Sequence, residues 1–120
     1  MHVSSCDLQE GFIALGYPYD NDQKVTLMHQ TEKIAKQAYA TRTLGAVALD
    51  LAYVAAGKID GALFAGLSWW DVAAGMLLIE KAGGTITDFK GKSIGPNYSS
   101  CMAGGKQIYQ ELKKLHMVQD

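Results

Sequence analysis

The residues with the clearest chemical potential lie in the stretch Trp70–Gly75, where one carboxylate, Asp71, precedes the nearly all-apolar run Val72–Ile79. An ionised carboxylate that is buried alone costs much free energy, so such a group is normally paired, hydrogen-bonded or bound to a metal. If a helix begins at Asp71, the carboxylate also lies at the positive end of the helix dipole. Asp71 is therefore either a helix N-cap that accepts hydrogen bonds from backbone amides or a group that faces a cation or a phosphate.

Other groups that could share a cation with Asp71 are scarce. No two acidic residues are adjacent, and the closest acidic cluster, residues 20–22, lacks the glycine and the distal glutamate of a calcium-binding loop. That cluster is more typical of a turn and a helix cap. The three histidines have no ligand spacing, and the two distant cysteines, Cys6 and Cys101, are expected to be reduced thiols and not zinc ligands.

Two further acids stand near the apolar helices. Asp50 interrupts the apolar stretch Ala46–Ala56, and we expect it to meet solvent or a buried partner. Asp60 begins a predicted strand, where a structural role is favoured over catalysis.

Apolar periodicity divides the chain into alternating strands and helices. Short apolar runs predict strands at residues 11–16, 41–43, 59–64, 85–88 and 100–103. Helical spacing predicts one helix from about residue 23 and others at residues 45–56, 71–82 and 105–116. Gly57 and Gly83 are expected to end the two apolar helices, because glycine readily adopts the left-handed conformation. The alternation predicts an α/β fold with helices on both faces of a sheet.

Composition limits the class of protein. Of the 120 residues, 48% are hydrophobic and 19% are charged, and the formal net charge is −1. This is typical of one globular domain, and it gives no electrostatic reason to expect nucleic-acid binding. The apolar stretches are shorter than the roughly 20 residues that span a bilayer, and no signal peptide is visible. We therefore expect a single cytoplasmic domain over residues 1–120.

Several stretches, taken in their order along the chain, resemble a known family. They are Arg42 with Gly45, residues 48–61, residues 70–75, residues 80–84, and Asp88 with Gly91. The set looks like the carboxy-terminal half of the inositol monophosphatase family, the lithium-sensitive, magnesium-dependent sugar-phosphate phosphatases. The likeness covers roughly residues 12–115. It implies a fold of class α/β, with a mixed, mostly parallel five-stranded sheet and helices on both faces.

The resemblance also implies roles for individual residues. Asp71 would ligate the Mg²⁺ ion that stabilises the leaving-group oxygen, in a site that holds two or three such ions. The backbone of Gly45, Ala46 and Val47 would contact the substrate, which suits the free amides of a helix start. The alternative is that Gly45 only permits a tight turn. Phe64 would line the pocket where inositol-preferring members carry a glutamate, so the resemblance does not extend to inositol specificity.

Part of the family's site has no counterpart in these residues. Family members carry an amino-terminal half with a Glu-Glu pair and an Asp-Pro-Leu/Ile-Asp-Gly-Thr motif, and neither motif occurs here. These motifs supply most of the metal ligands. The resemblance therefore implies the carboxy-terminal domain of a Mg²⁺-dependent phosphomonoesterase, inactive in isolation. Its substrate would be inositol phosphate or a related sugar or nucleotide phosphate.

An alternative function is a stand-alone, non-catalytic module that binds a partner or forms an oligomer. A domain that lacks its other half is expected to expose an apolar face. The expected partners are the missing amino-terminal half, a small phosphorylated substrate and a second copy of the chain. Neither nucleic acid nor a membrane is expected.

Overall fold

A five-stranded sheet forms the centre of the molecule, with the strand order β2-β1-β3-β5-β4. The computed structural model describes residues 1–17, 21–43, 45–65, 69–97 and 100–119. The strands are β1 (Phe12–Gly16), β2 (Ala40–Arg42), β3 (Gly61–Ala65), β4 (Thr85–Thr87) and β5 (Ser100–Gly104). Each overlaps a range that the sequence predicts.

The directions of the strands correct one expectation. β1 pairs in parallel with β2 and with β3, whereas β5 pairs antiparallel with β3 and with β4. The strand pairs are thus evenly divided between parallel and antiparallel, so the prediction of a mostly parallel sheet overstated the parallel share. The described part of the connection from β4 to β5 contains no helix. Parallel neighbouring strands need a long crossover connection, which is usually a helix, whereas a connection without a helix allows antiparallel neighbours such as β4 and β5.

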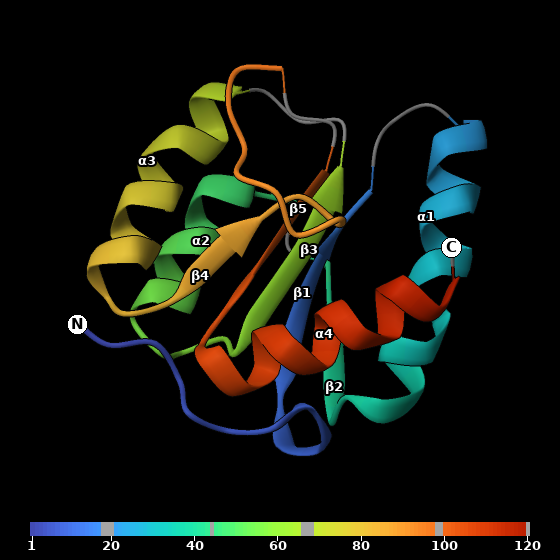
Figure 1. The fold of residues 1–120 in the computed structure, drawn as a ribbon, viewed down its shortest axis with the longest axis horizontal. Helices are drawn as coiled ribbons and strands as arrows, with labels where there is room; N and C mark the ends of the chain where they lie inside the picture. The colour runs from blue at the N-terminus through green and yellow to red at the C-terminus, as the bar shows by residue number, and fades with distance from the viewer. Residues whose placement is uncertain (18–20, 44, 66–68, 98–99, 120) are drawn as a thin grey trace.

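Helices cover both faces of the sheet, as predicted (Figure 1). α2 (Val47–Ala55) and α3 (Trp69–Lys81) lie on one face, and α1 (Asn21–Gln37) and α4 (Lys106–Gln119) lie on the other. Alternate residues of each strand serve the two faces. Ala62 and Phe64 of β3 belong to the core under α2 and α3, whereas Leu63 belongs to the core under α1 and α4.

The ends of the helices agree with the sequence only in part. Gly57 and Gly83 have φ angles of 74° and 87°, so both glycines end their helices in the predicted left-handed conformation. The start of α3 was predicted two residues too late, because the helix begins at Trp69 and not at Asp71. Among the described helices, none is long and apolar enough to cross a membrane.

The first residues of the chain pack along the edge opposite to the carboxyl ends of β1 and β3. The Val3 amide donates to the Ala82 carbonyl at 3.1 Å, and a Cβ on Gly57 would lie only 2.8 Å from the His2 carbonyl oxygen. A short 3₁₀ helix, η1 (Leu8–Glu10), then leads into β1. Its residues carry no periodicity in the sequence that predicts a helix.

Candidate functional site

Asp71 lies in the first turn of α3, and its side chain is exposed. The buried stripe of α3 consists of Val72, Gly75 and Ile79, so the carboxylate faces away from the core. Asp71 therefore does not carry the cost of a buried acid, and it can face a ligand outside the fold. The N-cap hypothesis was wrong, because Asp71 is the third residue of the helix.

The start of α2 supplies a second group of polar atoms. Gly45 has a φ of 77° and precedes Ala46, the N-cap residue, whose side chain makes no capping hydrogen bond. Both residues are exposed. The first amides of a helix have no partner within the helix. The first turn of α2, which begins at Val47, therefore presents backbone donors that no N-cap side chain satisfies. The positive φ of Gly45 also agrees with the alternative that this glycine only permits a tight turn. Residues with a side chain would adopt this backbone conformation with strain.

Close packing of α2 on α3 brings these two helix starts together. A Cβ on Gly75 would lie 2.5 Å from Leu51 Cδ1 and 2.6 Å from Leu51 Cβ, so the two helices touch at this point. Both helices run opposite to the parallel strands that flank them, and so they point in the same direction. One helical turn back from the contact lie Val47 on α2 and Asp71 on α3.

The first turns of α2 and α3, which we call the helix-start pair, lie at the edge of the sheet where a ligand is expected. Both helices start beyond the carboxyl ends of β1 and β3, at the upper edge in Figure 1. Open α/β sheets bind ligands at the carboxyl ends of their strands. The geometry can thus present one exposed carboxylate and several backbone donors to the same ligand.

Phe64 is placed differently from the other predicted site residues. Its side chain is 1% exposed and packs in the core under α2 and α3, next to Cys101 of β5 in the sheet register. A phenyl ring in this position contributes to packing and is not accessible to a ligand in the described residues. Its role in a substrate pocket remains a prediction.

Asp50 is the residue whose environment the sequence misjudged most. It is 2% exposed, and its Oδ1 atom has no hydrogen-bond partner in the described part of the chain. Desolvation by burial raises the pKa of this carboxyl from its ordinary value of 3.8 to about 6. The only signal in the sequence was that Asp50 shares a helical stripe with Leu51 and Val54.

Asp60 has the structural role that was expected. Its Oδ2 atom accepts a hydrogen bond of 2.7 Å from the Phe12 amide, and its own amide donates to the Phe12 carbonyl at 2.9 Å. The residue therefore ties the start of β1 to the start of β3. It lies at the opposite edge of the sheet from Asp71 and cannot share a ligand with it.

The described residues do not form a complete metal site. No group of three or more His, Cys, Asp or Glu side chains that could hold a metal ion occurs among them. Mg²⁺ prefers octahedral oxygen coordination, usually with carboxylates and substrate phosphate. Asp71 alone can provide at most part of such a set, so the residues present do not fit a resident Mg²⁺ ion.

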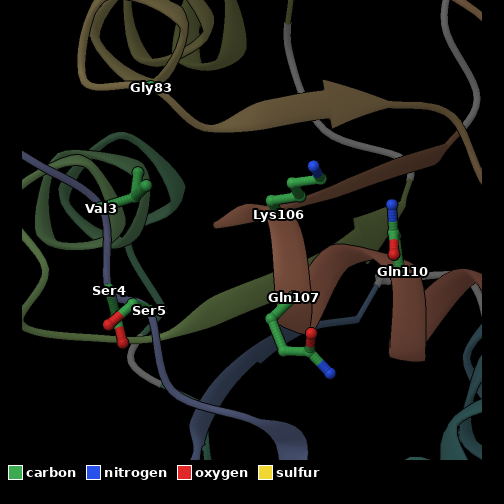
Figure 2. Close-up of a pocket in the computed structure, with 7 residues that line it drawn as sticks. All are labelled: Val3, Ser4, Ser5, Gly83, Lys106, Gln107 and Gln110. Carbon is green, nitrogen blue, oxygen red and sulfur yellow. The ribbon is translucent and has the colours of Figure 1, made fainter.

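A separate cavity lies at the other end of α3. Its volume is about 450 Å³, and it opens between the first residues of the chain and the start of α4 (Figure 2). The lining residues are mostly polar and include Val3, Ser4, Ser5, Gly83, Lys106, Gln107 and Gln110. α3 has 13 residues, which corresponds to a length of about 20 Å. This cavity therefore contains none of the predicted site residues.

The fold defines an α/β domain with helices on both faces of a mixed sheet, and the comparisons with known proteins assign this domain to a family. The model of the inositol monophosphatase family matches residues 1–118. The chain belongs to this family.

Individual relatives carry two different names. The inositol-1-monophosphatase of Mesorhizobium japonicum is 44% identical over 85 residues, which are 71% of this chain and 32% of the relative. The Nus factor SuhB of Escherichia coli K12 is 38% identical over 110 residues, which are 88% of this chain and 40% of the relative. The chain thus spans well under half the length of these relatives.

Solved structures give the same picture. The inositol monophosphatase of Anabaena superimposes with a TM-score of 0.89 at 29% identity, over 98% of this chain and 49% of that chain. The suppressor protein suhB of Bartonella henselae superimposes with a TM-score of 0.86 at 33% identity, over 97% of this chain and 46% of that chain. Each solved relative therefore contains a further portion about as large as the part matched here.

Proposed function

We propose that this chain supplies one part of a Mg²⁺-dependent phosphomonoesterase site, in which Asp71 is a metal ligand. The observation that carries the proposal is the pairing of the exposed Asp71 carboxylate with the uncapped start of α2, in a member of the inositol monophosphatase family. A carboxylate suits a cation, and free helix amides suit a phosphate or a hydroxylated ligand.

The proposed substrates are inositol phosphate or a related sugar or nucleotide phosphate. Val47, Ala46 and Gly45 would hold a substrate oxygen through backbone amides, which orients the phosphate ester relative to Asp71. Phe64 cannot accept a hydrogen bond from a sugar hydroxyl. This absence of an acceptor argues against a strict preference for inositol.

The chain on its own is proposed to be inactive. Two-metal phosphate hydrolysis needs several carboxylates that hold the ions about 3.5–4 Å apart. The described residues offer Asp71 and no second acid beside it in a metal-binding group. Further ligands must then come from a portion of the family fold that these residues do not include.

The test is a turnover assay of residues 1–120 with inositol 1-phosphate and Mg²⁺, with phosphate release followed over hours. We expect a rate indistinguishable from that of buffer, with the Mesorhizobium japonicum inositol-1-monophosphatase as the positive control. A Mg²⁺-dependent rate that persists through a second, orthogonal purification and disappears in Asp71→Asn would show that the chain is a complete enzyme. The claim of inactivity would then be wrong.

A second candidate function is a non-catalytic, partner-binding module. It is favoured by the large hydrophobic side chains that α2 and α3 expose, and several relatives are named Nus factors and not phosphatases. Tight metal-independent binding of a partner, together with inactivity of every longer form of the protein, would favour this candidate.

A further inference from the structure

The cavity at the start of α4 has walls from segments that are distant in the sequence. It measures about 450 Å³ and lies between residues 3–5, the turn after α3 and the first turns of α4 (Figure 2). The hydrogen bond from the Val3 amide to the Ala82 carbonyl holds the first wall against the end of α3. A Cβ on Gly105 would overlap the Ser4 carbonyl oxygen, so the first wall also touches the start of α4. Backbone packing therefore fixes the walls, and the volume suits a small-molecule ligand.

The side chains around this cavity are mostly hydrogen-bonding groups, namely those of Ser4, Ser5, Lys106, Gln107 and Gln110. Gln110 lies one helical turn from both Lys106 and Gln107, so the three side chains are neighbours on the surface of α4. The Ser4 Oγ atom accepts a hydrogen bond of 3.1 Å from the Cys6 amide and keeps its own proton for donation. The described lining thus carries one full positive charge, several donors and no acidic group.

Helix stability does not explain the lysine in this lining. Lys106 is the first residue of α4, and the first turn of the helix contains no acid. A positive charge at this end opposes the helix dipole and is mildly destabilising. Among the described residues, the ion pair is that of Lys36 with Glu32, and Lys106 takes no part in one. An anion in the cavity would provide the counter-charge that the fold does not supply.

We infer that this cavity binds a phosphorylated sugar or polyol, with the phosphate at Lys106 and the hydroxyl groups at the glutamine and serine side chains. A phosphate combines high negative charge with several strong acceptor oxygens, which suits an ammonium group that has amide donors beside it. Most small-molecule pockets are lined by apolar and aromatic side chains. Here Val3 is the only large apolar residue in the described lining, and no aromatic ring is available to stack on a base. A hydroxylated ligand is therefore favoured over a nucleotide.

The site is independent of the proposed function of Asp71. Gly83 follows the end of α3, whereas Asp71 lies in the first turn of that helix. The length of α3 separates the two places, so one small ligand cannot occupy both. Binding in the cavity should therefore need neither Mg²⁺ nor Asp71.

The experiment is a titration of ¹⁵N-labelled residues 1–120 with glucose 6-phosphate in buffer with EDTA, followed by amide chemical shifts. Glucose, inorganic phosphate, citrate and AMP are titrated in parallel. The test variants are Lys106→Gln, which removes the charge, and Gln110→Glu, which places an acid beside the bound phosphate. Lys33→Gln is the matched control, because Lys33 is an exposed lysine of α1.

We expect saturable shifts at residues 3–5 and 105–110, with a Kd for glucose 6-phosphate below about 1 mM. Lys106→Gln and Gln110→Glu should each weaken binding at least about tenfold, whereas Lys33→Gln and Asp71→Asn should leave it unchanged. Without ligand, the thermal midpoint of Lys106→Gln should equal or exceed that of the parent, because a charge that opposes the helix dipole is gone. A lysine with a purely structural role would give a lower midpoint.

Other outcomes would overturn the inference. Absence of shifts around the cavity up to about 10 mM glucose 6-phosphate would show that no such site exists. Equal affinity for inorganic phosphate would reduce the cavity to a simple anion site, and tighter binding of citrate or AMP would contradict the ligand class. Equal weakening by Lys106→Gln and Lys33→Gln would assign the binding to diffuse surface charge. Shifts confined to residues 45–47 and 71 would place the ligand at the helix-start pair.

Discussion

At the scale of single residues, two aspartates in similar sequence contexts have opposite environments. Asp50 and Asp71 both stand in the first turns of apolar helices, but Asp71 is exposed and Asp50 is 2% exposed. The helical phase decides the difference. Asp50 lies on the stripe of Leu51 and Val54, which faces the core, whereas Asp71 is displaced from the buried stripe of its helix. A carboxylate that faces solvent is free to bind a ligand, and a buried one without a partner carries an energetic cost.

This cost predicts that the stability of the fold depends on the ionisation of Asp50. Its folded-state pKa of about 6 lies above the ordinary value of 3.8, so the fold disfavours the ionised form. The penalty is absent below about pH 4, grows between about pH 4 and pH 6, and is complete above that range. The pKa shift corresponds to a destabilisation of at most about 3 kcal/mol when Asp50 is ionised. A buried asparagine amide also needs a hydrogen-bond partner, which offsets part of the gain. We therefore expect Asp50→Asn to stabilise the fold at pH 7.5 by about 1–2 kcal/mol.

Urea unfolding at pH 4, 5.5 and 7.5 measures this effect. The difference in unfolding free energy between Asp50→Asn and the parent chain should be near zero or negative at pH 4 and should increase with pH. Asp71→Asn is the matched control, because its exposed carboxylate should leave the difference nearly constant. A difference for Asp50→Asn that does not change with pH would show that an unseen partner satisfies the Asp50 carboxylate.

At the scale of elements, the contact of α2 with α3 sets the geometry of the candidate site. Gly75 has no side chain, and Leu51 occupies the space that a Cβ would need. This close approach fixes the axial register of the two helices, and the register places their first turns together. The glycine is therefore a packing requirement inside a helix, where it is otherwise unfavourable by about 1 kcal/mol relative to alanine.

Replacing this glycine should separate the helices. Gly75→Ala should destabilise the fold by about 1–3 kcal/mol despite the better helix propensity of alanine, because the new methyl group overlaps Leu51. In a Leu51→Ala background the same substitution should cost less but still destabilise the fold, because the contact with Cδ1 at 2.5 Å is removed and the contact with Cβ at 2.6 Å remains. Thermal unfolding of the four proteins gives this double-mutant cycle. Additive effects would contradict the proposed steric contact.

The elements also show how far the sequence could be interpreted. Apolar runs located each of the strands in the described part of the chain, because burial on one or both faces imposes this pattern on the residues. The antiparallel direction of β5 was not predicted, because it depends on the path of the chain between β4 and β5 and not on the apolar pattern of the strand itself. The start of α3 was predicted too late because Asp71 was taken as the first helical residue, although Ser68, a residue type preferred at N-caps, directly precedes Trp69 in the sequence.

The candidate site was predictable only as a resemblance. The order of Arg42, Gly45 and Trp70–Gly75 identified the family, which the family model confirms. The roles of Gly45, Ala46, Val47, Phe64 and Asp71 remain predictions. Burial patterns carry no information about ligands that other residues contribute, and this explains why the sequence leaves the proposed site of Asp71 incomplete.

At the scale of the whole molecule, the incomplete metal site agrees with the length of the relatives. The described residues hold no complete metal-binding group, and each solved relative contains a further portion about as large as the part matched here. The chain spans 40% of the Escherichia coli relative, so most of such a protein lies beyond what is described here. Under the proposed function, catalysis is a property of the assembled fold, to which this chain contributes Asp71.

The most direct test is the Mg²⁺-dependent hydrolysis of inositol 1-phosphate by a chimera in which the unmatched portion of Escherichia coli SuhB precedes Met1, with and without Asp71→Asn. The account predicts turnover by the parent chimera and a loss of at least about a hundredfold in kcat in Asp71→Asn, because one metal ligand is removed. Circular dichroism and the thermal midpoint should be nearly unchanged, since Asp71 is exposed. A chimera in which Asp71→Asn hydrolyses the substrate as fast as the parent would contradict the central claim.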